Sequence, residues 1–196
     1  MNEQMNALDA SKSKPLEGGP SFSLGHRSYR ALWNVTWLLL ARWTPPFMHP
    51  WRRVLLRLFG AKIAGGAHVY PSVRIWDPRN LEMDSHSCLG RRADCYSMAR
   101  ISLGAHAIVS QDARLCAGLH DIDDPEFQLV TKPIVIGDHA WVASGAFVGP
   151  GVSIGEGAVL GACAVAFKDL REWGVYIGNP MVFLRTRHHL DRSTIL

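Results

Sequence analysis

The sequence predicts an all-β fold: a parallel β-helix of about five triangular coils, with a helical extension before it and a short tail after it. Three observations predict this fold. An aliphatic residue recurs every six positions, a small residue follows it, and the pattern breaks after every third hexad. The clearest run comprises Ile136, Val142, Val148, Ile154, Leu160 and Ala166. A six-residue period fits neither an α-helix, at about 3.6 residues per turn, nor a hairpin meander.

The breaks in the pattern are themselves regular. Two extra residues follow the hexads that end the first and second coils, and about fifteen follow the third before the run resumes at Ile136. Three hexads therefore form one coil, and every insertion emerges at the same corner. We expect small residues at the crowded turns of such a prism. The fifth residues of the first and second hexads fit: Ala67, Ser87, Ala107, Ala140 and Ala158, then Val73, Ala93, Ala113, Ala146 and Ala164.

The chain divides into four segments. Residues 1–26, rich in Gly, Ser and Pro, indicate a flexible lead-in, and residues 27–62 indicate a basic, Trp-rich helical extension. Residues 63–171 carry the hexads, and residues 172–196 form a C-terminal loop and tail. Prolines divide the extension into a helix over 28–43 and a second helix after Pro50.

The second helix is expected to be amphipathic. Its apolar face is predicted to comprise Trp51, Val54, Leu55, Leu58 and Phe59, opposite Arg52, Arg53 and Arg57. Residues 1–62 carry a net charge of +6, whereas the remainder carries −2. Four of the seven tryptophans also lie there: Trp33, Trp37, Trp43 and Trp51. Tryptophan among Arg and Leu favours a lipid headgroup interface and disfavours nucleic acid, although packing on the main domain or on another subunit explains the pattern equally well.

Composition excludes several classes of protein. No run approaches the ~20 apolar residues of a membrane-spanning helix, which excludes an integral membrane protein. The four cysteines form neither a CxxC pair nor a disulfide framework. With no signal peptide visible, the cytoplasm is the simplest location, where the extension would allow peripheral contact with the inner face of the membrane.

The repeats resemble those of the hexapeptide-repeat acyltransferases over residues 63–187. The most specific stretch is PIVIGDHAWVASGAFVGPGVSIGEGAVLGACAVAFKDLREWGVYIGNPMVFLRTR. The segments SFSLGHRSYRALWNVTWLLL and WRRVLLRLFGAKI further resemble the colanic-acid-type O-acetyltransferases of polysaccharide biosynthesis. The resemblance implies a left-handed β-helix, acetyl-CoA as acyl donor, and a homotrimer with the donor bound between neighbouring prisms.

His120 is the candidate catalytic residue. It lies where residues 116–133 interrupt the repeat, and the family's catalytic histidine begins such a loop. An imidazole suits removal of a hydroxyl proton near neutral pH, a contribution typically worth ~10²–10⁴-fold. Asp121, Asp123 and Asp124 are candidates to orient the ring or to hold the acceptor. Cys116, beside His120, is a rival nucleophile, although a buried cysteine is more often structural.

The remaining site residues follow from the resemblance. Those matched to coenzyme A contacts are Trp141, Ser144, Ala162, Phe167, Lys168 and Arg185. Cations at two of these positions suit a donor with several negative charges. Phe167 replaces the family's usual threonine, and Met181 replaces a small residue. For the saccharide acceptor, Asp94, Tyr96 and Asp121 are the expected contacts.

No metal site is expected. A β-helical carbonic anhydrase needs three converging imidazoles, whereas His120 occupies a different hexad position from His106 and His139. The resemblance thus implies an acetyl-CoA-dependent O-acetyltransferase that acts on a sugar hydroxyl in extracellular or capsular polysaccharide biosynthesis, by direct transfer with His120 as general base. Two alternatives stay open: transfer to an amino sugar or small free acceptor such as an antibiotic, and a catalytically decayed scaffold.

Overall fold

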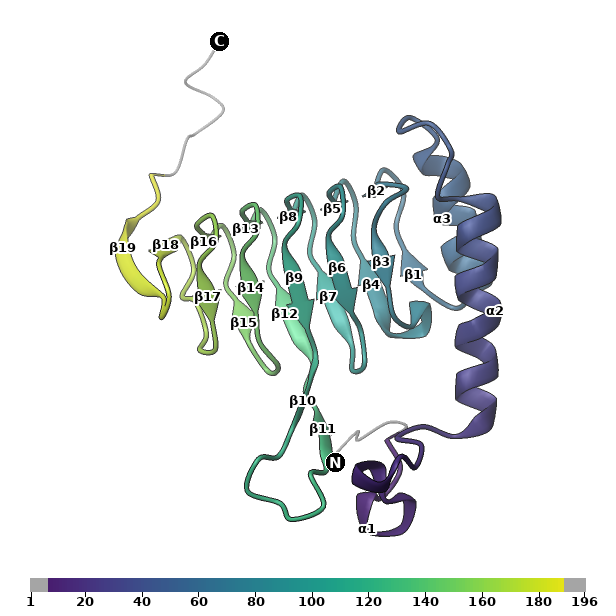
Figure 1. Ribbon diagram of the computed structural model, residues 1–196. Coiled ribbons are helices and arrows are strands. Elements are labelled where there is room, and N and C mark those ends of the chain that lie inside the picture. Colours follow the sequence, from purple (N-terminus) through teal and green to yellow (C-terminus); the bar gives the residue numbers. More distant parts are fainter. Residues whose placement is uncertain (1–6, 189–196) are drawn as a thin grey trace.

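The computed structural model describes residues 7–188 and contains a prism of short strands stacked in three parallel sheets (Figure 1). The first face comprises β1 (Lys62–Ile63), β4 (Leu81–Met83), β7 (Ile101–Leu103), β12 (Ile134–Ile136) and β15 (Ser153–Ile154). The second comprises β2 (His68–Val69), β5 (Cys88–Leu89), β8 (Ile108–Val109), β13 (Trp141–Val142) and β16 (Val159–Leu160). The third comprises β3 (Arg74–Ile75), β6 (Asp94–Tyr96), β9 (Arg114–Cys116), β14 (Phe147–Val148) and β17 (Val165–Ala166).

The stacked coils confirm the predicted parallel β-helix. Each complete coil contributes one strand to each face, which gives five complete coils. A sixth begins where Leu170 bridges to Ile154 and β18 (Gly174–Ile177) pairs in parallel with β16. β19 (Val182–Thr186) then turns back antiparallel to β18 and closes that end of the second sheet.

The core of the prism is filled by the hexad residues. Aliphatic side chains such as Leu115 and Leu160 are almost wholly buried, and corner alanines such as Ala107 and Ala140 have no exposed surface. The residue before each of these two alanines, His106 or His139, takes a left-handed backbone conformation and faces outward. Because the corner then turns sharply inward, a larger side chain there would overpack the core.

Two helices close the end of the prism that precedes the first coil (Figure 1). Ser23 caps α2 (Leu24–Leu40) by accepting a hydrogen bond from the His26 amide, and α3 (His49–Leu58) follows. Trp33 and Leu56 belong to the same buried cluster as the first-coil residues. A solenoid needs such a cap because its last coil would otherwise expose an apolar core.

The predicted apolar face of α3 is wrong in part. Trp51, Val54 and Leu58 are 38%, 45% and 76% exposed, whereas Arg52 has no exposed surface. The Arg52 guanidinium donates to the carbonyl of Val69 at 2.6 Å. It also donates to the Thr44 hydroxyl and to the carbonyls of the loop before α3, so each nitrogen of the buried cation donates at least one hydrogen bond.

The segment before α2 is folded where the sequence indicated a flexible lead-in. Within its described part, α1 (Ala10–Ser13) is followed by a 3₁₀ turn (Pro15–Glu17). The Gln128 side chain accepts a hydrogen bond from the Ala10 amide at 2.7 Å and donates to the Leu8 carbonyl at 3.3 Å. The Gln128 side chain, 118 residues from Ala10 in sequence, therefore joins this segment to the loop that follows His120.

Candidate active site

The long insertion forms a hairpin that projects from the prism between the third and first faces (Figure 1). Its strands are β10 (Gly118–His120) and β11 (Leu129–Thr131), which pair antiparallel. His120 is the last residue of β10 and pairs with Leu129. The imidazole therefore lies at the base of the loop 121–128, where the pairing of the two strands fixes its backbone.

The geometry of the His120 ring determines which nitrogen is available. Nδ1 lies 2.7 Å from the carbonyl oxygen of Phe127, and the two rings stack with centroids 4.4 Å apart. A carbonyl can only accept a hydrogen bond, so in the neutral ring Nδ1 carries the proton and Nε2 keeps its lone pair. The half-buried imidazole is thus oriented as a base through Nε2.

Two aspartates of this loop accept hydrogen bonds from backbone amides within the loop, and within residues 7–188 no hydrogen bond joins them to the His120 ring. Asp121 Oδ1 accepts from the Asp123 amide at 3.0 Å, and Asp124 Oδ1 accepts from the Glu126 amide at 2.8 Å. These side chains shape the turns of the loop. The group that orients the imidazole is the Phe127 carbonyl, which sequence reasoning missed because a backbone acceptor leaves no signature in residue type.

His120 lines a groove with a cavity volume of about 450 Å³ between the hairpin, the N-terminal segment and the third face. Its walls include Arg27, Arg30, Trp76 and Tyr96. Tyr96, one of the two predicted acceptor contacts of β6, therefore shares a groove with His120. Partial burial raises the pKa of its phenol above the ordinary 10.0, so the hydroxyl is a neutral hydrogen-bonding group at physiological pH.

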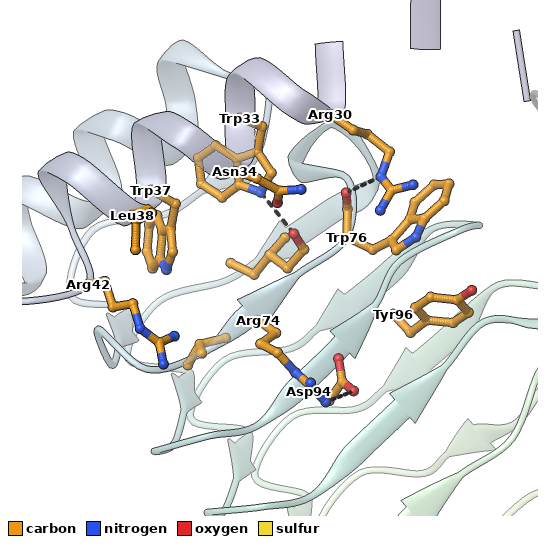
Figure 2. Close-up of a pocket in the computed structure, with 12 residues that line it drawn as sticks. Arg30, Trp33, Asn34, Trp37, Leu38, Arg42, Arg74, Trp76, Asp94 and Tyr96 are labelled. Carbon is orange, nitrogen blue, oxygen red and sulfur yellow. Dashed lines mark hydrogen bonds and ion pairs between the residues drawn. The ribbon is translucent and has the colours of Figure 1, made fainter. Parts of the chain in front are cut away.

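A second groove, of about 490 Å³, adjoins the first between α2 and the third face (Figure 2). It contains Asp94, the other predicted contact of β6, whose carboxylate pairs with Arg74 at 2.5 Å. Arg30, Trp76 and Tyr96 line both grooves, so the two form one continuous surface.

The contribution of α2 to this surface was not predicted. Its residues in the second groove are Arg30, Trp33, Asn34, Trp37 and Leu38. They are spaced i, i+3, i+4, i+7 and i+8, which is one face of a helix, and that spacing was the available signal. Trp33 and Trp37 thus pack on the prism, whereas Trp43 is 76% exposed.

The rival chemistries find little support. Burial raises the pKa of the Cys116 thiol above its ordinary 9.0, and its Sγ lies 3.1 Å from the Gly118 carbonyl, so a thiolate is disfavoured. The rings of His106 and His139 stack in parallel, 5.0 Å apart, rather than converging. Within residues 7–188, no three His, Cys, Asp or Glu side chains are grouped as metal ligands.

The residues matched to coenzyme A contacts lie further along the prism. Trp141, in β13, is 43% exposed on the second face, and its indole nitrogen donates to the Ser110 hydroxyl at 2.9 Å. Ser144 and Ala162 follow β13 and β16 at one corner, in consecutive coils. The Cys163 amide donates to the Ser144 carbonyl at 3.0 Å and fixes that stacking.

Of the other three, Phe167 and Lys168 lie beyond the corner that follows the third face, whereas Arg185 lies in β19 at the end of the second sheet. Phe167 follows β17, is 65% exposed, and its ring lies 5.5 Å from that of Phe147. Lys168 is exposed beside it, and Arg185 is exposed in β19. None of the six lines the His120 groove of the same described chain. A single chain therefore brings His120, Tyr96 and Asp94 together along one surface, and presents the donor candidates on others.

Comparisons with known proteins agree with this architecture. The family model "Bacterial transferase hexapeptide (six repeats)" matches residues 133–166. The chain is 40% identical over 156 residues to the protein named "Putative colanic acid biosynthesis acetyltransferase WcaF" of Escherichia coli (strain K12), covering 80% of this chain and 86% of that protein.

Solved structures show the same fold. A hexapeptide-repeat acetyltransferase of Vibrio cholerae O1 biovar eltor, complexed with acetyl coenzyme A, is 19% identical with a TM-score of 0.77, covering 93% of this chain and all of that one. A galactoside acetyltransferase in complex with coenzyme A is 20% identical with a TM-score of 0.77, covering 92% of both chains. These likenesses confirm a left-handed parallel β-helix.

Proposed function

The chain belongs to the hexapeptide-repeat acyltransferases, and on that premise we propose that it transfers an acetyl group from acetyl-CoA to a sugar hydroxyl in the biosynthesis of an extracellular polysaccharide. The 40% identical relative is named for colanic acid biosynthesis, which supports this class of acceptor. The donor is supported by the neighbours of the same fold that bind acetyl coenzyme A or coenzyme A.

In the proposed reaction, His120 Nε2 takes the proton of the acceptor hydroxyl as its oxygen attacks the thioester carbonyl carbon. The carbon–sulfur bond then breaks, and the proton passes from the imidazolium to the departing thiolate of coenzyme A. The products are the acetyl ester and free coenzyme A, and the imidazole is neutral again. No covalent enzyme intermediate is needed, in keeping with the disfavoured thiolate of Cys116.

One observation carries the assignment: Nδ1 of His120 is engaged by the Phe127 carbonyl at 2.7 Å, on the rim of a groove with aromatic and cationic walls. That hydrogen bond stabilises the imidazolium as it forms, because the carbonyl dipole attracts the Nδ1 proton more strongly when the ring is charged. We propose Tyr96 and Asp94 as acceptor contacts on the same surface, together with Asp121, which follows His120 directly and also shapes the loop.

The donor is proposed to lie along Trp141, Ser144 and Ala162, with Phe167 near its arm and Lys168 and Arg185 near its phosphates. Since these residues do not line the His120 groove of their own chain, we propose that the groove of one subunit is completed by the donor-binding residues of a neighbour in a homotrimer. Mass measurement in solution tests this directly, because a stable monomer with full activity would contradict it.

Steady-state kinetics with acetyl-CoA and a panel of glycans test the catalytic assignment. His120→Ala is expected to lower kcat by ~10²–10⁴-fold, the usual worth of a general base, while coenzyme A affinity by calorimetry changes little. His188→Ala, in the tail, is the control. Unchanged turnover in His120→Ala would refute the assignment, and amino sugars acetylated in preference to hydroxyl sugars would move the reaction to an N-acetyltransferase.

We also propose peripheral contact with an anionic membrane through α2, α3 and their connecting loop. Large apolar side chains are exposed there: Leu38 56%, Leu39 58%, Trp43 76%, Phe47 78%, Val54 45% and Leu58 76%. Arg42 is exposed among them. Apolar and aromatic side chains with neighbouring cations suit the headgroup region of a bilayer. Among residues 7–188, no helix has the length and apolarity to cross a bilayer.

Vesicle flotation tests this contact. The protein is expected to float with vesicles that contain anionic lipid, and Trp43→Ser with Phe47→Ser is expected to abolish flotation. Phe183→Ser, at the opposite end of the prism, serves as the control. Equal recovery of both variants with the vesicles would contradict the proposed contact.

A further inference from the structure

The groove between α2 and the third face continues the surface that begins at His120. It shares Arg30, Trp76 and Tyr96 with the groove at His120 and then continues along α2 toward Arg42 (Figure 2). The two volumes, about 450 and 490 Å³, are each of the size of a small-molecule site.

Aromatic side chains line this second groove on both sides. Trp33 and Trp37 come from α2, and Trp76 and Tyr96 come from the third face. The ring of Trp76 is held in place by Arg30. The Arg30 guanidinium lies 3.7 Å from the ring centroid and donates a hydrogen bond to the backbone carbonyl of Trp76 at 3.2 Å. Trp33 and Trp37 are almost wholly buried, so the partly exposed rings of Trp76 and Tyr96 are the ones that a sugar ring can contact.

The charge of the groove is predominantly positive. Its charged side chains are Arg30, Arg42, Arg74 and Asp94. Asp94 neutralises Arg74 at 2.5 Å, and Arg30 is occupied by Trp76. The Arg42 guanidinium makes neither an ion pair nor a hydrogen bond with residues 7–188 and turns into the groove in Figure 2. A cation on an aromatic-lined wall is suited to a carboxylate or a phosphate.

Trp37 gives an independent sign of a ligand. Its side chain is 7% exposed, and its indole nitrogen is buried with no hydrogen-bond partner. The neighbouring Trp33, by contrast, donates to the Ile75 carbonyl at 2.8 Å. An unpaired buried donor is costly, and in Figure 2 the Trp37 nitrogen points from α2 toward the groove. An acceptor atom supplied by a bound molecule would satisfy it.

We propose that this groove is a second acceptor subsite, which binds an anionic unit, carrying a carboxylate or a phosphate, next to the sugar that is acetylated at His120. Arg42 pairs with the anion, Trp37 donates to it or to a neighbouring sugar oxygen, and the aromatic walls hold the ring. The role as an acceptor subsite rests on the function proposed above, whereas binding of the anionic unit does not require turnover. The acceptor is therefore an oligosaccharide or a phosphate-linked sugar rather than a neutral monosaccharide.

Binding is measured on the full chain by NMR with ¹⁵N-labelled tryptophan, the Trp37 indole signal being identified by its loss in Trp37→Phe. The probes are methyl β-glucuronide, glucose 1-phosphate and the neutral methyl β-glucoside. We expect at least one anionic probe to shift the Trp37 signal and to bind about tenfold more tightly than the neutral glucoside, the scale of one charge-assisted hydrogen bond. The tighter of the two anions identifies the source of the charge.

Arg42→Ala is expected to remove the preference for the anion, and Arg92→Ala, an exposed arginine outside the groove that pairs with Asp112, is expected to keep it. Equal affinity for all three probes, an unmoved Trp37 signal, or an unchanged preference in Arg42→Ala would overturn the proposal. His120→Ala separates this proposal from the function: it should bind the anionic probes normally. If His120→Ala loses catalysis but binds the anionic probes, the subsite is supported. If the anionic probes fail to bind the unaltered protein, the subsite is refuted, while the catalytic role of His120 is unaffected.

Discussion

Arg52→Met is expected to destabilise the protein more than any other replacement of an arginine in α3. The Arg52 guanidinium donates to the Val69 carbonyl at 2.6 Å, the Thr44 hydroxyl at 2.7 Å and the Pro45 carbonyl at 3.0 Å. Hydrogen bonds to a charged group contribute about 1.5–3 kcal/mol each. Pro45 is exposed and regains water, so we count chiefly the bonds to the buried partners and expect a loss of about 3–5 kcal/mol.

Urea unfolding, followed by the fluorescence of the buried tryptophans, measures this loss. Arg53→Met is the matched control, because Arg53 is the next residue of α3 and donates a single bond, to the Ala67 carbonyl at 2.9 Å. Because Arg53 is only half-buried and water can replace its bond, its expected loss is about 1 kcal/mol, less than for a buried charged bond. Equal losses in the two variants, or a loss under about 1 kcal/mol in Arg52→Met, would refute the reasoning that Arg52 anchors the helical cap.

Three further predictions concern the packing of the core, the binding of the acetyl-CoA donor and the loss of stability at low pH. Leu115 is 1% exposed, so Leu115→Ala should lower the free energy of unfolding in urea by about 2–5 kcal/mol. Ile108 is 45% exposed, so Ile108→Ala should lower it far less, and similar losses in the two variants would contradict the assigned core. Iodoacetamide should label the exposed Cys163 first, and acetyl-CoA should slow that reaction. Cys95 should stay unlabelled, because burial raises the pKa of its thiol to about 12, and rapid labelling of Cys95 would contradict its burial. Burial lowers the pKa of His26 below 6.5, so the unfolded chain binds the proton more readily. The free energy of unfolding should therefore fall as the pH drops below 6.5. It should fall less in His26→Gln than in the control His86→Gln, which replaces an exposed histidine, and identical pH profiles of the two variants would contradict this role of His26.

The prism was predictable because its pattern is local and repeated. Each coil must turn the same aliphatic positions inward and fit small residues at its corners. The six-residue spacing alone therefore predicts that Leu115 lies in the core and that Ala107 lies at a corner. The resemblance added the position of His120 at the insertion. Neither source contains the Phe127 carbonyl that orients the ring, since every residue carries such a group.

The helical extension was less predictable for a physical reason. Amphipathic spacing assigns arginine to solvent, but Arg52 meets enough carbonyls, from the prism and from the preceding loop, to be buried. Those partners are brought together only by the fold. The second groove is likewise formed by α2 and by strands more than 30 residues later, so the face made by Arg30, Trp33 and Trp37 could not be matched to its opposite wall from the sequence.

The central claim is that His120 Nε2 receives the proton of an acceptor hydroxyl. It is tested most directly by a crystal structure of the protein with coenzyme A and an acceptor glycan bound. We predict an acceptor hydroxyl oxygen about 2.6–3.2 Å from Nε2, with Nδ1 still bonded to the Phe127 carbonyl. A glycan bound out of reach of His120, with another side chain in contact with its reactive hydroxyl, would contradict the account.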